Sequence, residues 1–443
     1  MRIIIVGAGA VGSYLAERLS AGGQDVVVIE DNEAIAADLQ ESIDALVLRG
    51  NGASVHMLEE AGAANTDLLI AVTNSDGANI LACYTGTQLG AKATIARIED
   101  GELREGADRL GVDLIIDPSA TAAEDLVGIV GLGGASELIE FADGELVMVG
   151  GHVAPNAAIT AGPLRELRLR QAEWGWVVAA LVRDGRTIVA HGDTVVRPGD
   201  HALLMTTEDR VDDATRLIGV KRRHIDRVII IGGTRLAEIT ADVMDEAGLS
   251  VVVVEEEQDR CRYLADRHSF ALVINGDPTD PEVLGDLDLG PKDVVMALSG
   301  WDEVNLMACL VGKASGAGMA VSRFNRISYV SLLSGHGIDA AVSQRLMAAS
   351  AMLRFVRQGQ VEQVATFSDT DAEALEIEVE ATSEAVGKTL LDLNLPVGVI
   401  VGGISRDGTT FVPDGSTVVR AGDHIIFFAL PRDIAESSAL FTA

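Results

Sequence analysis

Short apolar runs, each ending in small or polar residues, recur along the first 116 residues of the chain. Between them, apolar positions return at the three-to-four-residue spacing of a helix that buries one face. Runs that are apolar throughout are typical of strands buried on both faces of a parallel sheet. The pattern therefore predicts an α/β fold with a doubly wound parallel sheet. The expected strands are 2–6, 25–30, 45–49, 68–71, 93–97 and 114–116, with helices from about Ala10, Asn32, Ser54 and Asp76.

The same pattern returns in the second half of the chain. Gly7 matches Gly232 and Glu30 matches Glu255 at an offset of 225, and Arg97 matches Arg323 at 226. The sequences of residues 183–205 and 406–428 are more similar still, because both contain the motif RDGxTxVxxGxTVVRxGDH. A register that drifts so little over two hundred residues indicates a tandem duplication.

Each half is expected to contain two modules in the same order. In the smaller one, short strands at 147–149, 177–182, 187–190 and 201–205 are separated by turn residues, which favours a small α+β unit. We expect two Rossmann-like domains at 1–120 and 225–345, each followed by a small α+β domain, at 138–220 and 362–443. The expected joints are 219–226, which is polar and basic, and 356–362.

Charge and composition narrow the possible partners. A formal net charge of −33 repels phosphate backbones and anionic lipid headgroups, so nucleic acid is a poor candidate. The three scattered cysteines form no disulfide framework or metal motif, which fits the cytoplasm. The first residues lead directly into an expected strand, and no run of 18 or more apolar residues occurs, so we expect neither a signal peptide nor a membrane span.

The first strand runs into a glycine-rich turn that is typical of dinucleotide-binding proteins. Gly7, Gly9 and Gly12 form a GxGxxG motif, in which the glycines allow a tight turn, close approach of a pyrophosphate and helix packing. Glu30, at the tip of the second strand, can accept hydrogen bonds from ribose hydroxyls and repels a 2′-phosphate, which favours NAD or an adenine nucleotide over NADP. The alternative is a Rossmann-like core whose glycines serve packing alone.

Further candidates follow the carboxyl ends of the other strands, where ligands bind in open α/β sheets. Arg97 is expected either to reach a terminal phosphate or to form a surface ion pair. The full set of predicted ligand contacts in the first half is Gly7, Ala8, Gly9, Ala10, Val11, Gly12, Glu30, Asp31, Gly50, Asn51, Gly52, Thr73, Asn74, Asp76 and Arg97.

In the second half the glycine motif is altered. Thr234 stands where a pyrophosphate needs access to the backbone, and its β-branched side chain crowds that position. The module is expected to be either an altered site or a scaffold, with impaired dinucleotide binding preferred. Its candidate residues are Gly232, Gly233, Thr234, Glu255, Gly276, Asp277 and Arg323.

Residues for reaction chemistry are not evident. No HExxH motif, GxSxG elbow, Walker lysine loop or paired-carboxylate pattern occurs, so no catalytic residue and no metal ligand is predicted. An NAD-dependent dehydrogenase with two fused units remains the alternative, although it needs a proton donor that the sequence does not place.

The motifs IIIVGAGAVGSYLAERL, VTNSDGANILAC, IARI and RDG…TVVRPGD, with their counterparts, resemble those of the TrkA family over essentially the whole chain. Members of this family are peripheral cytosolic components of bacterial Trk- or Ktr-type potassium transporters, built from RCK domains in the order N, C, N, C. The resemblance implies a homo-oligomer, expected to be a ring, on the inner face of the membrane without insertion into it. It also implies a TrkH- or TrkG-like ion-conducting partner, and NAD(H), ATP or ADP as regulatory ligands rather than substrates. A regulator of another channel or of an antiporter is the remaining alternative.

Overall fold

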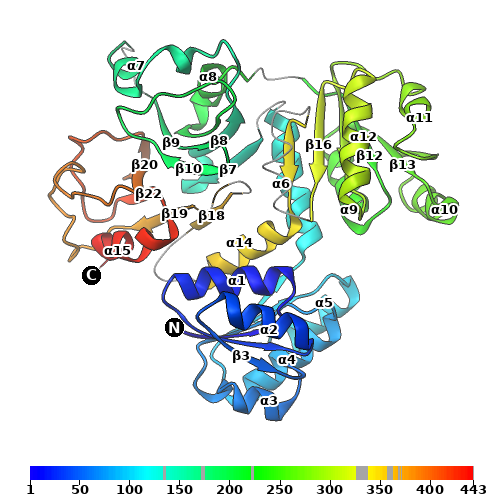
Figure 1. Ribbon diagram of the computed structural model, residues 1–443, viewed down its shortest axis with the longest axis horizontal. Helices are drawn as coiled ribbons and strands as arrows, with labels where there is room; N and C mark the ends of the chain where they lie inside the picture. The colour runs from blue at the N-terminus through cyan, green and yellow to red at the C-terminus, as the bar shows by residue number, and fades with distance from the viewer. Residues whose placement is uncertain are drawn as a thin grey trace. The chain divides into compact units, whose positions relative to one another are not determined.

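The protein contains two six-stranded parallel sheets that alternate along the chain with two five-stranded antiparallel sheets (Figure 1). The computed structural model describes residues 1–132, 136–170, 175–220, 224–325, 338–356, 363–367, 370 and 372–442. The chain divides into two compact units, one made of residues 1–121 and 345–364, the other of residues 122–344 and 365–443. Each unit thus combines segments from both halves of the duplication.

The first parallel sheet has the order β3-β2-β1-β4-β5-β6, the doubly wound order predicted from the apolar runs. Its strands begin and end within one residue of the predicted positions: β1 Arg2–Val6, β2 Asp25–Glu30, β3 Leu46–Arg49, β4 Leu68–Ala71, β5 Thr94–Arg97 and β6 Leu114–Ile116. The helices that follow them are α1 Ala10–Ala21, α2 Glu33–Ser42, α3 Val55–Glu60, α4 Asp76–Leu89, α5 Gly101–Arg109 and α6 Pro118–Leu132.

The helices that cover the two faces of this sheet come from different parts of the chain. On one face, α3 and α4 pack through Leu58, Ala82 and Cys83. On the other face, α1 packs beside α14 (Gln344–Val356), which is far away in the sequence (Figure 1). Ala348 and Met352 of α14 are fully buried in the same cluster as the strands of this sheet. The core of the first unit is therefore completed by a helix from the second half of the chain.

The second parallel sheet has the equivalent order, β14-β13-β12-β15-β16-β17. Its strands are β12 Arg227–Ile231, β13 Ser250–Glu255, β14 Leu272–Asn275, β15 Asp293–Ala297, β16 Met319–Arg323 and β17 Ala340–Val342. Its helices are α9 Arg235–Glu246, α10 Gln258–Arg267, α11 Pro281–Gly285 and α12 Asp302–Ala314. The matched cysteines Cys83 and Cys309 are core residues of the two sheets, and burial raises the pKa of each thiol to about 12.

Apart from Gln363 and Val364, the strands of the two antiparallel sheets lie in the second unit, and the two sheets share a hydrophobic core. Their strands are β7 Glu137–Phe141, β8 Leu146–His152, β9 Trp176–Arg183, β10 Arg186–Val189 and β11 His201–Thr207, then β18 Gln363–Thr366, β19 Glu373–Glu378, β20 Val399–Arg406, β21 Thr409–Phe411 and β22 His424–Ala429. The accompanying helices are α7 Leu164–Arg170, α8 Val211–Leu217 and α15 Pro431–Phe441. Met148 and Met205 of the first sheet are buried together with Ile426 and Phe428 of the second. The glycine at position 402 lets β20 approach β11 closely, since a Cβ at Gly402 would lie 3.1 Å from the Met205 Cβ.

The repeated RDG…GD frame is explained by a buried ion pair. In the first copy, the Arg183 guanidinium donates two hydrogen bonds of 2.7 Å to the two carboxylate oxygens of Asp200. Arg406 and Asp423 repeat this geometry with the same distances. The hydrogen bonds to the partner aspartates raise the pKa of both arginines. These residues stabilise the fold of the small modules.

Two further expectations concern the joints and membrane spans, and one strand was not expected. Parts of both predicted joints, residues 221–223 and 357–362, lie outside the described residues. Strand β7 was not predicted. Throughout the described ranges, each helix is too short or too polar to cross a bilayer.

Candidate nucleotide-binding site

A pocket of about 380 Å³ opens at the carboxyl ends of β1 to β4 in the first unit. This is the edge of an open α/β sheet at which ligands bind. It brings together many of the predicted residues, namely Gly7, Gly9, Glu30, Asp31, Gly50, Asn51, Gly52, Thr73 and Asn74. Residues that sequence reasoning did not select also line it: Val6, Ile29, Ile35, Ala53, Val72, Ser75 and Ala78.

Two glycines of the GxGxxG turn are required by the fold itself. Gly7 has a φ of +97°, and a Cβ there would lie 3.0 Å from the Thr73 Cγ2. A Cβ at Gly12 would lie 1.9 Å from the carbonyl oxygen of Gly7, closer than atoms can approach. The presence of glycine at these two positions is therefore explained by the fold and is not evidence for a ligand.

Gly9 is different. Its φ of −61° and ψ of −174° suit any residue, and a Cβ there would meet no other heavy atom within 4 Å. It lines the pocket and is the N-cap of α1, but it has no side chain that could accept a hydrogen bond from the first turn of that helix. Unpaired N–H groups at a helix start attract anions such as phosphate. The missing side chain at Gly9 leaves this N-terminus open to the pocket.

Glu30 lies at the tip of β2 and is 8% exposed. One carboxylate oxygen accepts a hydrogen bond of 2.5 Å from the backbone N–H of Ala8, and the other accepts one of 2.9 Å from the N–H of Asn32. The carboxylate thus fixes the glycine turn relative to the next strand. Because each ionised oxygen has a second lone pair, it can still accept hydrogen bonds from ribose hydroxyls.

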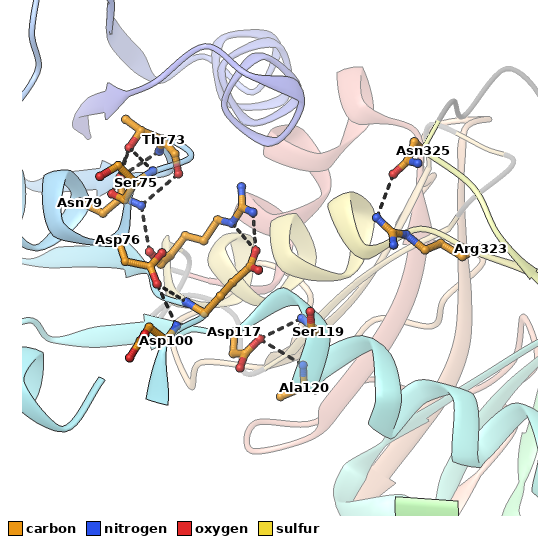
Figure 2. Close-up of polar contacts among 12 residues, drawn as sticks. Thr73, Ser75, Asp76, Asn79, Asp100, Asp117, Ser119, Ala120, Arg323 and Asn325 are labelled. Atoms are coloured by element: carbon orange, nitrogen blue, oxygen red, sulfur yellow. Dashed lines mark hydrogen bonds and ion pairs between the residues drawn. The ribbon is translucent and has the colours of Figure 1, made fainter. Parts of the chain in front are cut away.

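Asn79 holds the far wall of the pocket and was missed by sequence reasoning. It is fully buried, and its Oδ1 accepts hydrogen bonds from the backbone N–H and the hydroxyl of Thr73, at 2.9 and 2.7 Å (Figure 2). Its Nδ2 donates to the carbonyls of Thr73 and Arg97. The sequence feature that could have identified Asn79 is its equivalence with Asn305 in the repeat. The Asn305 amide makes corresponding hydrogen bonds to Ser299 and Arg323.

Other predicted contacts do not line the pocket. Asp76 accepts hydrogen bonds from the backbone N–H groups of Glu99 and Asp100, which fixes the loop after β5 (Figure 2). Arg97 pairs with the Glu99 carboxylate, as the ion-pair alternative expected. Val11 is buried in the sheet core, whereas Ala10 is exposed at the start of α1.

The candidate residues of the second half also keep the Rossmann geometry. Glu255 accepts hydrogen bonds from the backbone N–H groups of Gly233 and Glu257, as Glu30 does from Ala8 and Asn32. Gly232 has a φ of +93°. A Cβ at Gly276 would lie 3.1 Å from the side chain of Val283.

Two polar candidate residues of the second half, Asp277 and Arg323, form hydrogen bonds with residues two positions later in the chain. Asp277 accepts hydrogen bonds from the hydroxyl and the N–H of Thr279, and both lower its pKa. Arg323 donates to the Asn325 side chain at 3.2 Å (Figure 2).

Comparison with known proteins agrees with this architecture. The chain matches the TrkA-N domain family at residues 3–118 and 228–344 and the TrkA-C domain family at residues 153–219 and 374–442. It is 31% identical to a Trk system potassium uptake protein TrkA of Haemophilus influenzae, over 100% of this chain and 98% of that protein. It is 30% identical to a TrkA homologue of Methanosarcina mazei, over the full length of both.

Among solved structures, the fold is similar to the GsuK RCK domain, with a TM-score of 0.59, 19% identity and coverage of 99% of this chain and 94% of that one. The GsuK channel bound to NAD is similar over 99% of this chain and 78% of its own, at the same TM-score and identity. Two parallel sheets of Rossmann order, each followed by an antiparallel sheet, thus give the chain the fold of the GsuK RCK domain. The chain belongs to the TrkA family of Trk-system potassium uptake proteins.

Proposed function

We propose that this protein is a cytosolic regulatory subunit of a potassium uptake system, and that the pocket of the first unit binds NAD(H), ATP or ADP. Gly9 carries the proposal, because a Cβ there would meet no heavy atom of the described residues within 4 Å, and a residue without a side chain at the start of α1 leaves room for a phosphate. The TrkA relatives are named for potassium uptake, and a solved relative of the same fold is bound to NAD.

In this proposal the protein acts by binding, without a chemical step. A homo-oligomeric ring of these chains docks on a TrkH- or TrkG-like membrane subunit at the inner face of the cell membrane. The nucleotide shifts the ring between conducting and nonconducting arrangements only if it binds the two with different affinity, typically by about 1–3 kcal/mol. The ring is therefore a regulator and not an enzyme.

Binding is tested first by calorimetry on the purified chain. Glu30→Ala removes a charged acceptor worth about 1.5–3 kcal/mol, so affinity should fall roughly 10- to 150-fold. Glu33→Ala is the matched control, since it removes the same charge from the next helix at an exposed ion pair with Arg49. NADPH should bind more weakly than NADH, because its 2′-phosphate approaches the Glu30 carboxylate.

Regulation is then tested by potassium flux into proteoliposomes that contain the membrane subunit. Addition of this protein should make the flux depend on NADH, ATP or ADP, and the Glu30→Ala variant should lose that dependence. A wild-type chain that binds none of these nucleotides, or a flux indifferent to all of them, contradicts the proposal.

A further inference from the structure

The glycine turn of the second parallel sheet is covered by side chains of the protein itself. Thr234 is the N-cap of α9, and its hydroxyl oxygen accepts a hydrogen bond of 3.3 Å from the N–H of Ala237. The same hydroxyl donates to the carbonyl of Leu298 at 2.8 Å. The helix start that is open at Gly9 is therefore capped in the second copy.

Arg260 lies across the same turn. Its Nε donates a hydrogen bond of 2.6 Å to the carbonyl oxygen of Gly233, and a Cβ on Gly233 would lie 2.9 Å from the Arg260 Cγ. The rest of the guanidinium is held on two sides, by an ion pair with Glu238 on α9 and by the ring of Tyr263 at 4.7 Å. Glu238 is only 15% exposed and also pairs with Arg267. The arginine is thus fixed over the turn by several contacts.

These residues replace a matched set in the first copy. At the offset of 225, Thr234 corresponds to Gly9, Glu238 to Ser13 and Arg260 to Ile35. Gly9 and Ile35 line the open pocket, and the Ser13 hydroxyl donates to the carbonyl of Ala8. The three differences fit one another, because the acid on α9 neutralises the arginine that reaches over from α10, and the threonine satisfies the helix end.

We propose that the second copy is a self-closed nucleotide site, in which Thr234, Glu238 and Arg260 occupy the place and the hydrogen-bonding groups that a phosphate uses in the first copy. A phosphate that enters has to displace the Glu238 carboxylate from Arg260 and the Thr234 hydroxyl from the helix end, and both are held at high effective concentration within the chain. These three side chains then determine that the chain binds one nucleotide, in its first half. The inference rests on the function proposed above for the first pocket.

Reversion of the three residues to those of the first copy tests the proposal. The variant Thr234→Gly/Glu238→Ser/Arg260→Ile is titrated with NADH and with ADP by calorimetry, beside the wild type. The wild type should bind about one nucleotide per chain and the variant about two. Arg262→Ile is the matched control, because Arg262 is also on α10 but is exposed and pairs with Asp259, and it should leave the stoichiometry at one.

The opposite substitutions, made in the first copy, keep the proposal testable if the reverted variant does not fold. Gly9→Thr/Ser13→Glu/Ile35→Arg places the closing residues in the first copy. We expect this variant to bind NADH and ADP at least tenfold more weakly than the wild type and to retain its thermal unfolding transition. Two nucleotides per wild-type chain, a folded reverted variant that still binds one, or a folded converse variant that binds as the wild type does would each overturn the proposal. A wild type that binds none instead refutes the proposed function of the first pocket.

Discussion

Replacement of Gly9 by alanine separates a ligand role from a packing role at the glycine turn. The new methyl group meets no heavy atom within 4 Å, and the backbone angles suit alanine. Loss of glycine restricts the unfolded chain and adds about 0.4–1 kcal/mol of stability, whereas alanine is a poorer N-cap by up to about 1 kcal/mol. Because these effects oppose each other, we expect the free energy of unfolding to change by less than about 1 kcal/mol.

Nucleotide binding should respond much more strongly. Gly9 lines the pocket, so the methyl group holds a phosphate away from the N–H groups at the start of α1. The loss of one hydrogen bond to a charged phosphate costs about 1.5–3 kcal/mol, which is a roughly 10- to 150-fold weaker affinity. Gly12→Ala should behave differently, because its Cβ would lie 1.9 Å from the Gly7 carbonyl oxygen. We expect that variant to lose about 1–3 kcal/mol of stability as well as binding.

Calorimetric titration with NADH and ADP, together with urea unfolding, measures both quantities. Gly101→Ala is the control, because its Cβ also enters open space but lies at the first residue of α5, away from the pocket. Unchanged affinity in a folded Gly9→Ala variant would refute the reasoning. So would a loss of stability as large as that of Gly12→Ala, since Gly9 would then serve the fold.

Two other side chains give predictions of their own. Asn79→Ala removes the hydrogen-bond partner of the Thr73 N–H and of the Thr73 and Arg97 carbonyls, so we expect it to lower the free energy of unfolding by about 2–4 kcal/mol and to weaken nucleotide binding, measured by the same two methods. Unaltered stability would show that water replaces the amide. Asp200→Asn should cost about 2–3 kcal/mol on urea unfolding, because it removes the charge that partners a largely buried arginine, while nucleotide affinity stays unchanged. The exposed turn residue Asp184, changed to Asn, is its control and should cost almost nothing.

The architecture was predictable from the sequence because its dominant signals are local. Fully apolar runs such as 2–6 and 68–71 specify buried parallel strands, and the repeat transfers each assignment to the second half. Strand β7 (Glu137–Phe141) was missed because its sequence, ELIEF, mixes acids with apolar residues and carries no turn signal. The packing of α14 on the first sheet was also beyond sequence reasoning. A face of alanines and methionine shows that the helix is buried, but not which sheet covers it.

The candidate site was predictable where it depends on the backbone and less so where it depends on side chains. The glycine turn and Glu30 follow from the spacing after β1 and β2, and both line the pocket. The partner of Arg97 was not specified, because sequence spacing does not show that Glu99, two residues later, turns back onto the guanidinium. Similarly, a threonine at position 234 indicated an altered site, but the arginine that donates a hydrogen bond to the glycine turn comes from the next helix.

Helix α14 packs against the helix that begins at the pocket. Helix α1 begins at the turn that would hold the phosphate, and its residues Val11 and Leu15 pack in one cluster with Ala348 and Met352 of α14. Close-packed side chains transmit small shifts, because a core has no free volume to absorb them. In the function proposed above, we therefore expect a ligand that moves the start of α1 to shift α14 as well, the segment of the second half that leads along the chain to β18. The proposed open and closed sites fit this packing, since ligand binding in the first half would be sufficient to act on a helix that the second half supplies.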